Sequence, residues 1–540
     1  MNNLAYETTL SESFKSENGI FYTSDFVIDY ILSETLGEWL LEQKTLLKTI
    51  FDENSKSFYE KYIEKLLSVR ILDPSCGIGN FLSGAFVFLS KELQNISNFV
   101  YIDVKFYQEI ILKQVFYGVD IDKNACEIAQ ENLKIKHIFC GDSLISDISI
   151  SERAFDWEKA FPHVFEEGGF DIIIGNPPYV SFQTNLLKKS SIKFFTEHYE
   201  TSYKIFDLFG LFIERSIKNL LKSKGILAFI CPSVLLMNDS FSKLRSFMAK
   251  NGNFSRITFL ADGVFREAVV PTITFSFQKN VFRKEVKIAY PIENKKIATK
   301  KSINSDLFYQ NPEKGFNITI SEKSLDLIEK LKKNTIPLGE ILEIRESIKT
   351  GDDKSFISDT QKNTNYLPLV TGKDIQKFYL KQERFILFDE KLLKRPTKLT
   401  YYQREKLFIR RVSANLIATY DDKNNLATHV LYVSFLKEHQ IFYIKYLLAL
   451  LNSKLFDYVY HQLFPAKGKI FPEIRIGNLR ELFVKNISLE EQSIFVKMVD
   501  EILSKKAQNQ ETNFLEKELD LLIYQLYELS ETEIQLIENE

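Results

Sequence analysis

The chain has 540 residues, a length that corresponds to two to four domains of roughly 150 residues each. Its 45% hydrophobic and 26% charged residues match ordinary globular proteins and argue against large disordered regions. No apolar stretch reaches the about 18 residues of a membrane helix, the first 16 residues lack a signal-peptide core, and four cysteines exclude a disulfide scaffold. We therefore expect a cytoplasmic protein without a membrane partner.

The net charge of −2 conceals a segregation of charge along the chain. Residues 331–485 carry 27 basic and 17 acidic side chains, a net charge of +10, whereas residues 486–540 carry 4 and 13, a net charge of −9. Such an asymmetry is a reason to suspect a polyanionic partner for the basic block. A solvated lysine-rich surface would explain the same charge equally well.

Short apolar strands alternate with helices over the first 290 residues. Residues 1–66 are predicted to be mostly helical, and helices are also predicted at 81–92, 123–133 and 206–221. Strands are predicted at 69–73, 115–120, 137–140, 170–174, 226–231, 258–260 and 272–277. This alternation is typical of a doubly wound α/β domain with a mostly parallel sheet.

The remainder of the chain does not continue this alternation. Residues 291–330 are rich in Lys and Asn and are predicted to be a linker, and residues 331–485 form a mixed, aromatic block. Residues 486–540 are predicted to be helical, with a capping box at Ser530 that opens a last short helix. The predicted domains are therefore 1–66, 67–290, 291–330, 331–485 and 486–540.

A glycine-bearing turn follows the first predicted strand. The run Asp73-Pro74-Ser75-Cys76-Gly77-Ile78-Gly79 precedes a helix, at the strand end where doubly wound sheets bind their ligands. It is neither a dinucleotide fingerprint, because no third glycine follows, nor a P-loop, because Gly-Lys-Ser/Thr is missing. Taken alone it is compatible with an ordinary turn. The histidines and cysteines of the chain show no metal-ligand spacing.

Two further acidic residues follow the next two strands. Asp120 ends the second strand, where a carboxylate can accept hydrogen bonds from ribose hydroxyls. Asp142, in Cys140-Gly141-Asp142-Ser143, follows the third strand and can accept a hydrogen bond from an adenine amino group. Each acid alone is more often a loop cap, but together with Asp73 they stand at three successive strand ends and predict a nucleoside site.

The run Asn176-Pro177-Pro178-Tyr179 follows the fourth strand. The prolines hold the backbone extended, so that the Asn176 side-chain oxygen and the Pro177 carbonyl can converge on one amino group. Two such acceptors favour a pyramidal nitrogen with a localised lone pair, which makes a conjugated amine nucleophilic. Tyr179 offers a ring on which a planar base can stack.

These motifs, in this order, resemble the gamma-class (TaqI-type) N6-adenine DNA methyltransferases over nearly the whole chain. Gly19 to Thr23 resembles motif X, although the class usually has Thr-Pro where this chain has Thr23-Ser24. Asp73 to Gly79 resembles motif I, and Asp120, Asp142 and Asn176 to Tyr179 resemble motifs II, III and IV. Asp207 to Phe212 resembles motif V, and Phe265 resembles the motif VIII aromatic.

The resemblance implies a Rossmann-like, doubly wound S-adenosylmethionine-dependent methyltransferase domain, then a mixed α+β target-recognition domain and a helical C-terminal segment. It implies that Phe212 packs on the cofactor adenine and that Phe265 helps to sandwich an extruded base. Cys76 is expected to be a packing residue and not a nucleophile. The expected catalytic residues are Asn176, Pro177, Pro178, Tyr179 and Phe265; the expected cofactor-binding residues are Tyr22, Thr23, Asp73, Pro74, Cys76, Gly77, Gly79, Asp120, Ile121, Asp142, Ser143, Asn176 and Phe212; no metal is expected.

The basic block is the expected DNA reader. Its segments at residues 369–375 and 471–475 resemble pieces of the family's target-recognition domain, and residues 524–527 resemble its helical end. Most of its cations are expected to contact phosphate, which does not specify sequence, and any one of them is as easily a plain surface charge. The candidates are Lys373, Lys394, Arg395, Lys398, Arg404, Arg410, Arg411, Lys467 and Lys469.

The resemblance predicts a site-specific, adenine-specific DNA methyltransferase of a restriction-modification or related defence system. The expected partner is double-stranded DNA, bound by a monomer, with a separate restriction endonuclease as a further candidate partner. A protein glutamine-N5 or an RNA adenine methyltransferase would use the same Asn-Pro-Pro-Tyr chemistry, but neither calls for a basic module of this size. A fused nuclease would precede motif X, where 18 residues stand before Gly19, so we expect a standalone methyltransferase.

Overall fold

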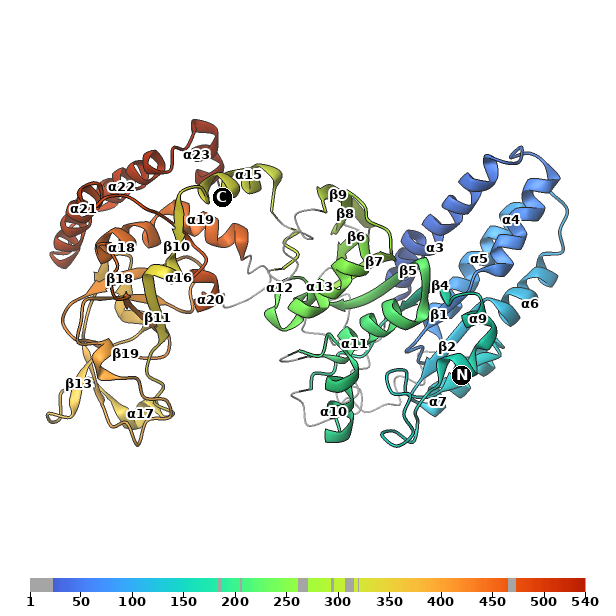
Figure 1. Cartoon of the computed structure of the whole chain (residues 1–540), viewed down its shortest axis with the longest axis horizontal. Helices are drawn as coiled ribbons and strands as arrows, with labels where there is room; N and C mark the ends of the chain where they lie inside the picture. The colour runs from blue at the N-terminus through green and yellow to red at the C-terminus, as the bar shows by residue number, and fades with distance from the viewer. Residues whose placement is uncertain are drawn as a thin grey trace. The chain divides into compact units, whose positions relative to one another are not determined.

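A computed structural model describes residues 23–182, 187–203, 206–260, 271–292, 296–305, 315–318, 320–464 and 473–539. The chain divides into two compact units, Met1–Ile318 and Thr319–Glu540, here called unit 1 and unit 2 (Figure 1). Among the described helices, none combines the length and the apolar character that crossing a membrane requires.

Unit 1 contains a nine-stranded sheet. Its strands lie in the order β3 (His137–Cys140), β2 (Phe116–Asp120), β1 (Ile71–Asp73), β4 (Phe170–Gly175), β5 (Leu221–Pro232), β7 (Thr272–Lys279), β6 (Gly252–Phe259), β8 (Glu285–Ile292) and β9 (Lys296–Asn304). The first five are parallel, and β7 runs antiparallel to both of its neighbours. The chain builds outward from β1 to β3 and then returns to place β4 on the other side of β1. In such sheets the point of reversal, between β1 and β4, is where ligands bind.

Helices cover both faces of this sheet because its central strands are apolar on both faces. Ile172 and Ile174 of β4 join one buried core, whereas Ile173 joins the other, as the two-residue period of a strand requires. The first core is shared with α3 (Asp25–Lys48), α4 (Lys56–Ser68), α5 (Asn80–Ser97), α6 (Val104–Gln114) and α7 (Lys123–Leu133). The second is shared with α8 (Trp157–Ala160), α9 (Pro162–Glu166), α10 (Lys189–His198), α11 (Leu208–Arg215), α12 (Val234–Met237) and α13 (Ser242–Asn251).

The predicted strands of unit 1 are all present, but the sheet extends further than the sequence pattern indicates. Residues 291–330, expected as a linker, include β9, which pairs with β8 at the edge of the sheet, and α15 (Glu322–Leu331) of unit 2. Lysine-rich sequence of this kind is common in edge strands, where it discourages pairing with other chains. The predicted helix at 206–221 is α11 continued by a π-helical turn, Ser216–Leu220.

Unit 2 is built from small sheets and helices around two cores. One sheet has the order β11 (Leu342–Glu346), β20 (Leu431–Leu436), β17 (Lys406–Arg410) and β18 (Ala418–Asp421). The other has the order β12 (Ile357–Ser358), β16 (Arg384–Leu387), β13 (Tyr366–Val370) and β19 (Leu426–Ala427). Two-stranded pairs are formed by β10 (Thr335–Pro337) with β21 (Phe483–Lys485) and by β14 (Ile375–Gln376) with β15 (Tyr379–Leu380).

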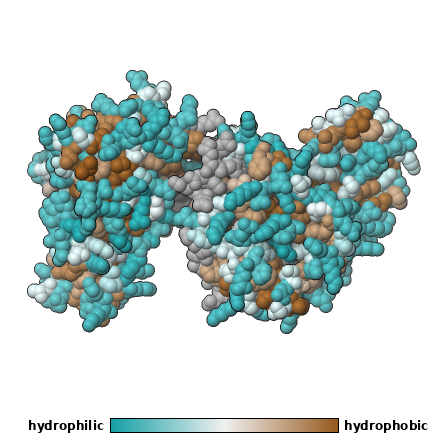
Figure 2. Space-filling model, viewed as in Figure 1, coloured by the Kyte–Doolittle hydropathy of each residue, from teal (hydrophilic) through white to brown (hydrophobic). Residues whose placement is uncertain are grey.

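The C-terminal helices belong to the same unit as the basic block that precedes them. Residues of α21 (Leu489–Ala507), α22 (Asn513–Leu526) and α23 (Glu531–Glu538) share a buried core with α18 (Ile444–Asn452), α19 (Lys454–Leu463) and β17. The short helices of unit 2 are α16 (Leu338–Ile341), α17 (Asp353–Phe356) and α20 (Ile476–Leu479). The capping box predicted at Ser530 is present at the start of α23. Most of the surface in view is hydrophilic (Figure 2).

Candidate functional site

Asp73 and Asn176 lie at the carboxyl ends of the two strands that flank the point of reversal. Asp73 ends β1, Gly175 ends the neighbouring β4, and Asn176 follows directly. The approach is so close that a Cβ on Gly175 would lie 2.7 Å from Asp73 Oδ1. A side chain at position 175 would therefore displace the carboxyl group. Gly175 was not singled out from the sequence, where only its place before Asn-Pro-Pro marks it.

Asp73 is a buried carboxyl group with a raised pKa. It is 1% exposed, and its Oδ1 accepts a hydrogen bond from the Ser75 backbone N–H at 3.0 Å. Burial raises the pKa of Asp73 to about 8, and the nearby Asp120 carboxylate adds to this rise. Such a strongly perturbed acid at a strand end is a marker of a functional site.

The glycine-bearing loop after β1 needs both of its glycines. Gly77 and Gly79 have φ angles of 51° and 87°, a left-handed backbone conformation that disfavours other residues. A Cβ on Gly79 would lie 2.7 Å from Leu133 Cδ1, whereas a Cβ on Gly77 would meet no atom within 4 Å. Gly79 thus fits the loop tightly against α7, while Gly77 faces open space that a ligand can occupy. Cys76 is 5% exposed and packs below the loop.

Asp120 connects the ends of β1 and β2. One carboxylate oxygen accepts a hydrogen bond from Gly77 N–H at 2.7 Å, and the other accepts one from Asp122 N–H at 2.9 Å. Burial also raises the pKa of Asp120. The next residue, Ile121, is apolar and yet 49% exposed, and Arg153 donates a hydrogen bond to its carbonyl oxygen at 2.7 Å. Arg153, which was not predicted from the sequence, therefore fixes the backbone that carries this exposed apolar side chain.

The segment after β3 is joined to the same loop. Ser143 Oγ donates a hydrogen bond to the Pro74 carbonyl at 2.6 Å, and the Trp157 indole donates to the Ser143 carbonyl at 3.2 Å. Asp142 Oδ1 accepts hydrogen bonds from Leu144 N–H at 3.0 Å and Ile145 N–H at 3.2 Å, and burial raises its pKa. The structure therefore brings together the ends of β1, β2 and β3, as their acids predicted.

The Asn-Pro-Pro-Tyr segment contacts both the N-terminal segment and α11. Asn176 Nδ2 donates a hydrogen bond to Thr23 Oγ1 at 3.3 Å, so two residues 153 positions apart in the sequence lie side by side. The Tyr179 ring packs edge-on against Phe209 of α11, with centroids 6.2 Å apart. Pro177 is buried, whereas Pro178 and Tyr179 are half-buried.

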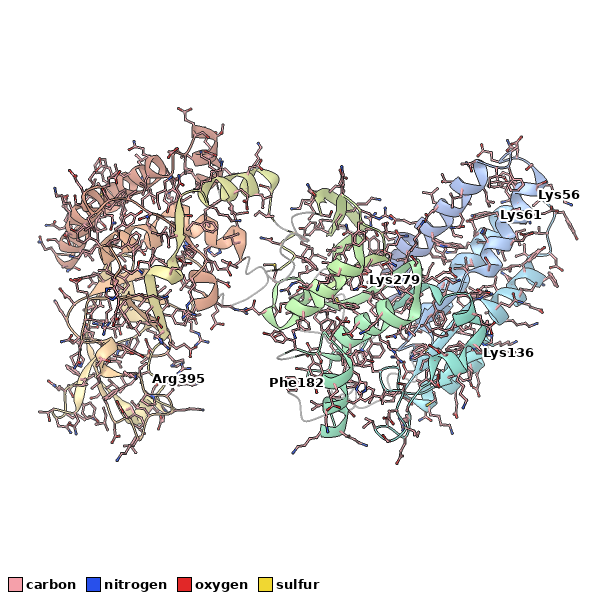
Figure 3. All side chains as sticks on the ribbon, in the orientation of Figure 1. Lys56, Lys61, Lys136, Phe182, Lys279 and Arg395 are labelled. Carbon is pink, nitrogen blue, oxygen red and sulfur yellow. The ribbon has the colours of Figure 1, made fainter. Side chains whose placement is uncertain are left out.

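A short antiparallel bridge fastens this segment to the start of α11. Leu208 N–H donates to the Val180 carbonyl at 2.9 Å, and Phe182 N–H donates to the Phe206 carbonyl at 3.1 Å. The rings of Phe182 and Phe206 stack with centroids 5.2 Å apart, and Figure 3 labels Phe182. Asp207, for which the sequence suggested no role of its own, pairs with Ser181 within this bridge. Phe212 of α11 is 7% exposed in the adjoining core.

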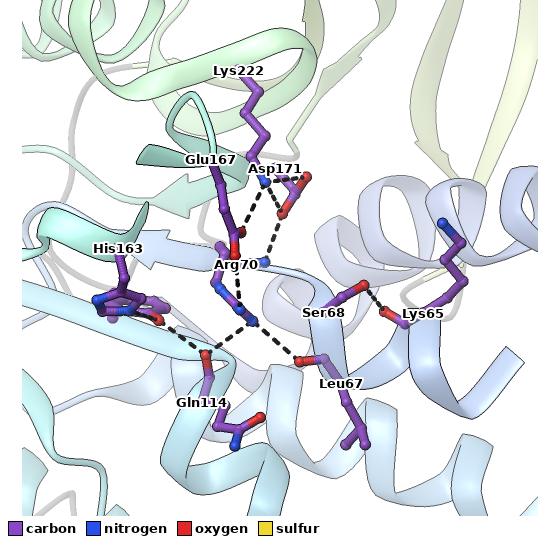
Figure 4. A network of polar contacts seen from close by, with 10 residues as sticks. Lys65, Leu67, Ser68, Arg70, Gln114, His163, Glu167, Asp171 and Lys222 are labelled. Carbon is purple, nitrogen blue, oxygen red and sulfur yellow. Dashed lines mark hydrogen bonds and ion pairs between the residues drawn. The ribbon is translucent and has the colours of Figure 1, made fainter. Parts of the chain in front are cut away.

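The opposite ends of β1 and β4 are fixed by a polar network (Figure 4). Arg70 donates hydrogen bonds to the carbonyls of Leu67 and Gln114 at 3.1 and 3.4 Å. Its backbone N–H donates to Asp171 Oδ2 at 2.8 Å, and Lys222 contacts the same carboxylate at 3.2 Å. This network links β1, β4 and β5 at their amino ends, which holds the register that brings Asp73 beside Gly175.

The candidate DNA-contacting cations of unit 2 fall into two groups. Lys373, Lys394, Lys398 and Arg404 are exposed. Arg395 and Arg411 are paired with Glu346 and Glu473, and Arg410 donates to the Ile375 carbonyl. Other predicted site residues lie outside the described part of the chain: Tyr22, Phe265, Lys467, Lys469, Phe471 and Pro472.

Two family models match the chain. Residues 114–265 match the Eco57I restriction-modification methylase model, and residues 367–484 match the TaqI-like C-terminal specificity domain. The first match contains β2 to β6, with Asp120, Asp142 and Asn176, and the second contains most of the basic block. The two matches lie in unit 1 and unit 2, respectively.

Known proteins similar to this chain are type II restriction-modification proteins. RM.MjaORFECS2P of Methanocaldococcus jannaschii, named as a type II restriction enzyme and methyltransferase, is 28% identical over 397 residues, covering 69% of this chain and 32% of its own length. The restriction enzyme and methyltransferase RM.Eco57I of Escherichia coli is 30% identical over 252 residues, covering 40% of this chain and 25% of its own. The chain thus matches about a third and a quarter of these two relatives. The type II methyltransferase M.VspI of a Vibrio species is 25% identical over 375 residues, with 69% and 74% covered.

Solved structures share the fold. The Type IIL restriction-modification enzyme MmeI, solved in complex with DNA, superposes with a TM-score of 0.62 at 14% sequence identity, covering 98% of this chain and 79% of that one. A DrdV–DNA complex superposes with a TM-score of 0.54 at 14% identity, covering 92% of this chain and 58% of that one. These likenesses show a shared fold, and together with the two family models they fit an α/β methyltransferase domain in unit 1 and a specificity domain in unit 2.

Proposed function

We propose that this chain, which carries an Eco57I-type restriction-modification methylase domain and a TaqI-like C-terminal specificity domain, transfers a methyl group to N6 of adenine in double-stranded DNA. The proposed methyl donor is S-adenosylmethionine, and the proposed setting is a restriction-modification system. The observation that carries the proposal is the position of Asn176-Pro177 at the carboxyl end of β4, directly beside the buried Asp73 and the glycine-bearing loop.

The residues around this loop suit S-adenosylmethionine. The space in front of Gly77 is open, Asp120 and Asp142 offer carboxylates at the neighbouring strand ends, and the exposed Ile121 offers an apolar contact for a planar base. We propose Asp120 for the ribose hydroxyls and Asp142 for the adenine amino group, with Asp73 near the methionine part. When bound, the cofactor would supply an electrophilic methyl group on its sulfonium.

The Asn-Pro-Pro-Tyr segment would hold the amino group that receives the methyl. An adenine amine is a weak nucleophile because its lone pair is delocalised into the ring. The Asn176 side-chain oxygen and the Pro177 carbonyl would accept its two N–H groups and localise that lone pair. The nitrogen would attack the methyl carbon directly, so that the carbon–sulfur bond breaks as the nitrogen–carbon bond forms, and the methylated nitrogen would then lose one proton. The contribution of the protein is therefore alignment of the reacting atoms and not a covalent intermediate. Thr23, bonded to Asn176, would keep the amide in the required orientation.

The target adenine would leave the duplex to reach this segment, at a cost of a few kcal/mol. Stacking on Tyr179 would offset part of that cost, at ~1–3 kcal/mol per base. Phe265 is the proposed second stacking partner, by its place in the sequence. Unit 2 would bind the duplex, as the relatives that bear restriction-enzyme names and the DNA complex of MmeI suggest. Duplex affinity is then expected to fall steeply with salt concentration.

The test offers plasmid DNA, RNA and protein as separate acceptors of the methyl group of labelled S-adenosylmethionine, followed by nucleoside analysis of the labelled nucleic acid. Label is expected in N6-methyladenine. Asn176→Ala is expected to abolish transfer because one of the two acceptors is gone, while duplex binding is largely kept. Asn98→Ala, at the exposed C-terminal end of α5, is the matched control and is expected to retain activity. Label in RNA or protein in place of DNA, or undiminished transfer by Asn176→Ala, would contradict the proposal.

A further inference from the structure

Two arginines of unit 2 are held by two glutamates in a cluster of charged side chains, here called the Glu346 cluster. Glu346, at the end of β11, contacts Arg395 and also lies 3.5 Å from Arg411 Nη1. Glu473 accepts a hydrogen bond from Arg411 Nε. The Glu346 carboxylate thus contacts the guanidinium groups of both arginines, and the Glu473 carboxylate contacts that of Arg411.

The segments that carry these side chains are fastened to one another through their backbones. Lys349 and Arg395 exchange two backbone hydrogen bonds, of 3.0 and 2.9 Å. The Arg411 carbonyl accepts from Ile474 N–H at 2.8 Å, and Arg411 N–H donates to the Val430 carbonyl at 2.9 Å. Strand β20 pairs with both β11 and β17 and so joins these two groups of segments, although they come from positions up to 127 residues apart (346 to 473). The cluster is therefore preorganised.

His429 stands between Thr428, which forms a β-bridge with Ile348, and Val430, whose carbonyl accepts from Arg411 N–H. Burial is the largest cause that lowers the pKa of His429. Lys349, Arg411 and Arg395 lower it further, whereas Asp353 raises it. Within the described part of the chain, the buried Nδ1 of His429 has no hydrogen-bond partner. Three cations thus act on one half-buried imidazole, and the carboxylates of Asp353, Glu346 and Glu473 offset their charge.

The two arginines remain accessible. The side chains of Arg395 and Arg411 are 42% and 28% exposed, and a guanidinium has five N–H donors, of which the glutamates engage only some. An arginine that is already held by ion pairs loses little conformational entropy on binding. Its two parallel N–H groups match the O6 and N7 acceptors of guanine in the major groove. Neighbouring carboxylates would repel phosphate. Lys373, Lys394 and Lys398 of the same unit are exposed, and in the described part of the chain no carboxylate holds their ammonium groups.

We infer that Arg395 and Arg411, aligned by Glu346 and Glu473, read base edges in the major groove, whereas the exposed lysines of unit 2 contact phosphate. This inference rests on the proposed function, because it assumes that unit 2 binds the duplex. It differs from the expectation that the cations of this block serve mainly as phosphate contacts. The guanidinium groups supply the hydrogen bonds, and the glutamates are positioning residues.

The variant Glu346→Gln distinguishes base reading by the two arginines from phosphate binding and from a purely structural role. The change keeps the size of the side chain but removes one negative charge, the ion pair of Arg395 and one of the two carboxylate contacts of Arg411, which stays bonded to Glu473. Nonspecific duplex affinity is expected to rise and its salt dependence to steepen by about one unit of slope, while the ratio of specific to nonspecific affinity falls about 10- to 100-fold. A purely structural role would lower both affinities together. The matched control is Glu343→Gln, on the same strand, whose glutamate pairs with Arg345 at 2.6 Å; it is expected to change neither.

The methylated sequence gives a second readout. Modified-base sequencing of DNA from cells that express the wild type defines the methylated motif. Arg411→Ala and Arg395→Ala are each expected to relax one position of that motif and leave the others intact. An unchanged motif with uniformly weaker methylation and a salt slope reduced by about one would identify them as phosphate contacts and overturn the inference. Absence of any methylated motif in wild-type cells would instead refute the proposed function, so the two failures are distinguishable.

Discussion

The pH dependence of stability offers a quantitative test of the buried acid at the centre of the site. Asp73 has a pKa of about 8 in the folded protein, whereas the unfolded chain has the ordinary value of 3.8. Between these two values the folded state binds one more proton than the unfolded state. The unfolding free energy therefore decreases as pH rises, by about 1.4 kcal/mol per pH unit for this one group. At pH 7 the loss relative to pH 4 is at most about 4 kcal/mol by the same conversion.

Asp73→Asn removes this titration while preserving an oxygen that can accept from Ser75 N–H. The variant is expected to match the wild type in stability near pH 4 and to exceed it increasingly up to pH 8, above which the difference levels off. Urea unfolding followed by tryptophan fluorescence measures this in unit 1 alone, because both tryptophans, Trp39 and Trp157, belong to it. The exposed Asp29 provides the control Asp29→Asn. A difference between Asp73→Asn and wild type that does not vary with pH would refute the burial argument.

Three further results are expected. Affinity for S-adenosylmethionine, measured by calorimetry, should increase as pH rises toward 8 in the wild type and vary less in Asp73→Asn, because a bound cation favours the ionised carboxylate; an identical pH profile for both would count against Asp73 as a cofactor neighbour. Gly79→Ala should weaken cofactor binding and cost about 1–2 kcal/mol of stability, since φ is 87° and the added Cβ would lie 2.7 Å from Leu133; undiminished binding would contradict this. Lys406→Met should destabilise unit 2 by about 3–5 kcal/mol in calorimetry, because the buried Asp421 carboxylate keeps its hydrogen bonds from Asn425 but loses the cation 2.6 Å away; a mild loss would refute this.

The candidate site of unit 1 was predictable because its residues are marked locally. Asp73, Asp120 and Asp142 stand at strand ends, and Asn-Pro-Pro-Tyr has a backbone constrained by its own prolines, so short-range sequence was sufficient to place them. The adjacency of β1 and β4, and hence the close approach of Gly175 to Asp73, depends on how the whole sheet is ordered. No local pattern contains that information.

The features missed from the sequence depend on contacts between distant residues. The ion pairs of Arg395 with Glu346 and of Arg411 with Glu473 join residues 49 and 62 positions apart. The polar sequence around β9 contains no apolar alternation to reveal that it completes a sheet, and only its pairing with β8 shows this. The C-terminal helices were predicted as helices from their periodicity, but their common core with β17 is a tertiary property.

Modified-base sequencing of genomic DNA from cells that express this chain tests the central claim most directly. The account predicts N6-methyladenine at one adenine of a single short sequence, and its complete loss in cells that express Asn176→Ala. DNA without modified adenine in the wild-type cells, or methylation on a cytosine, would contradict it.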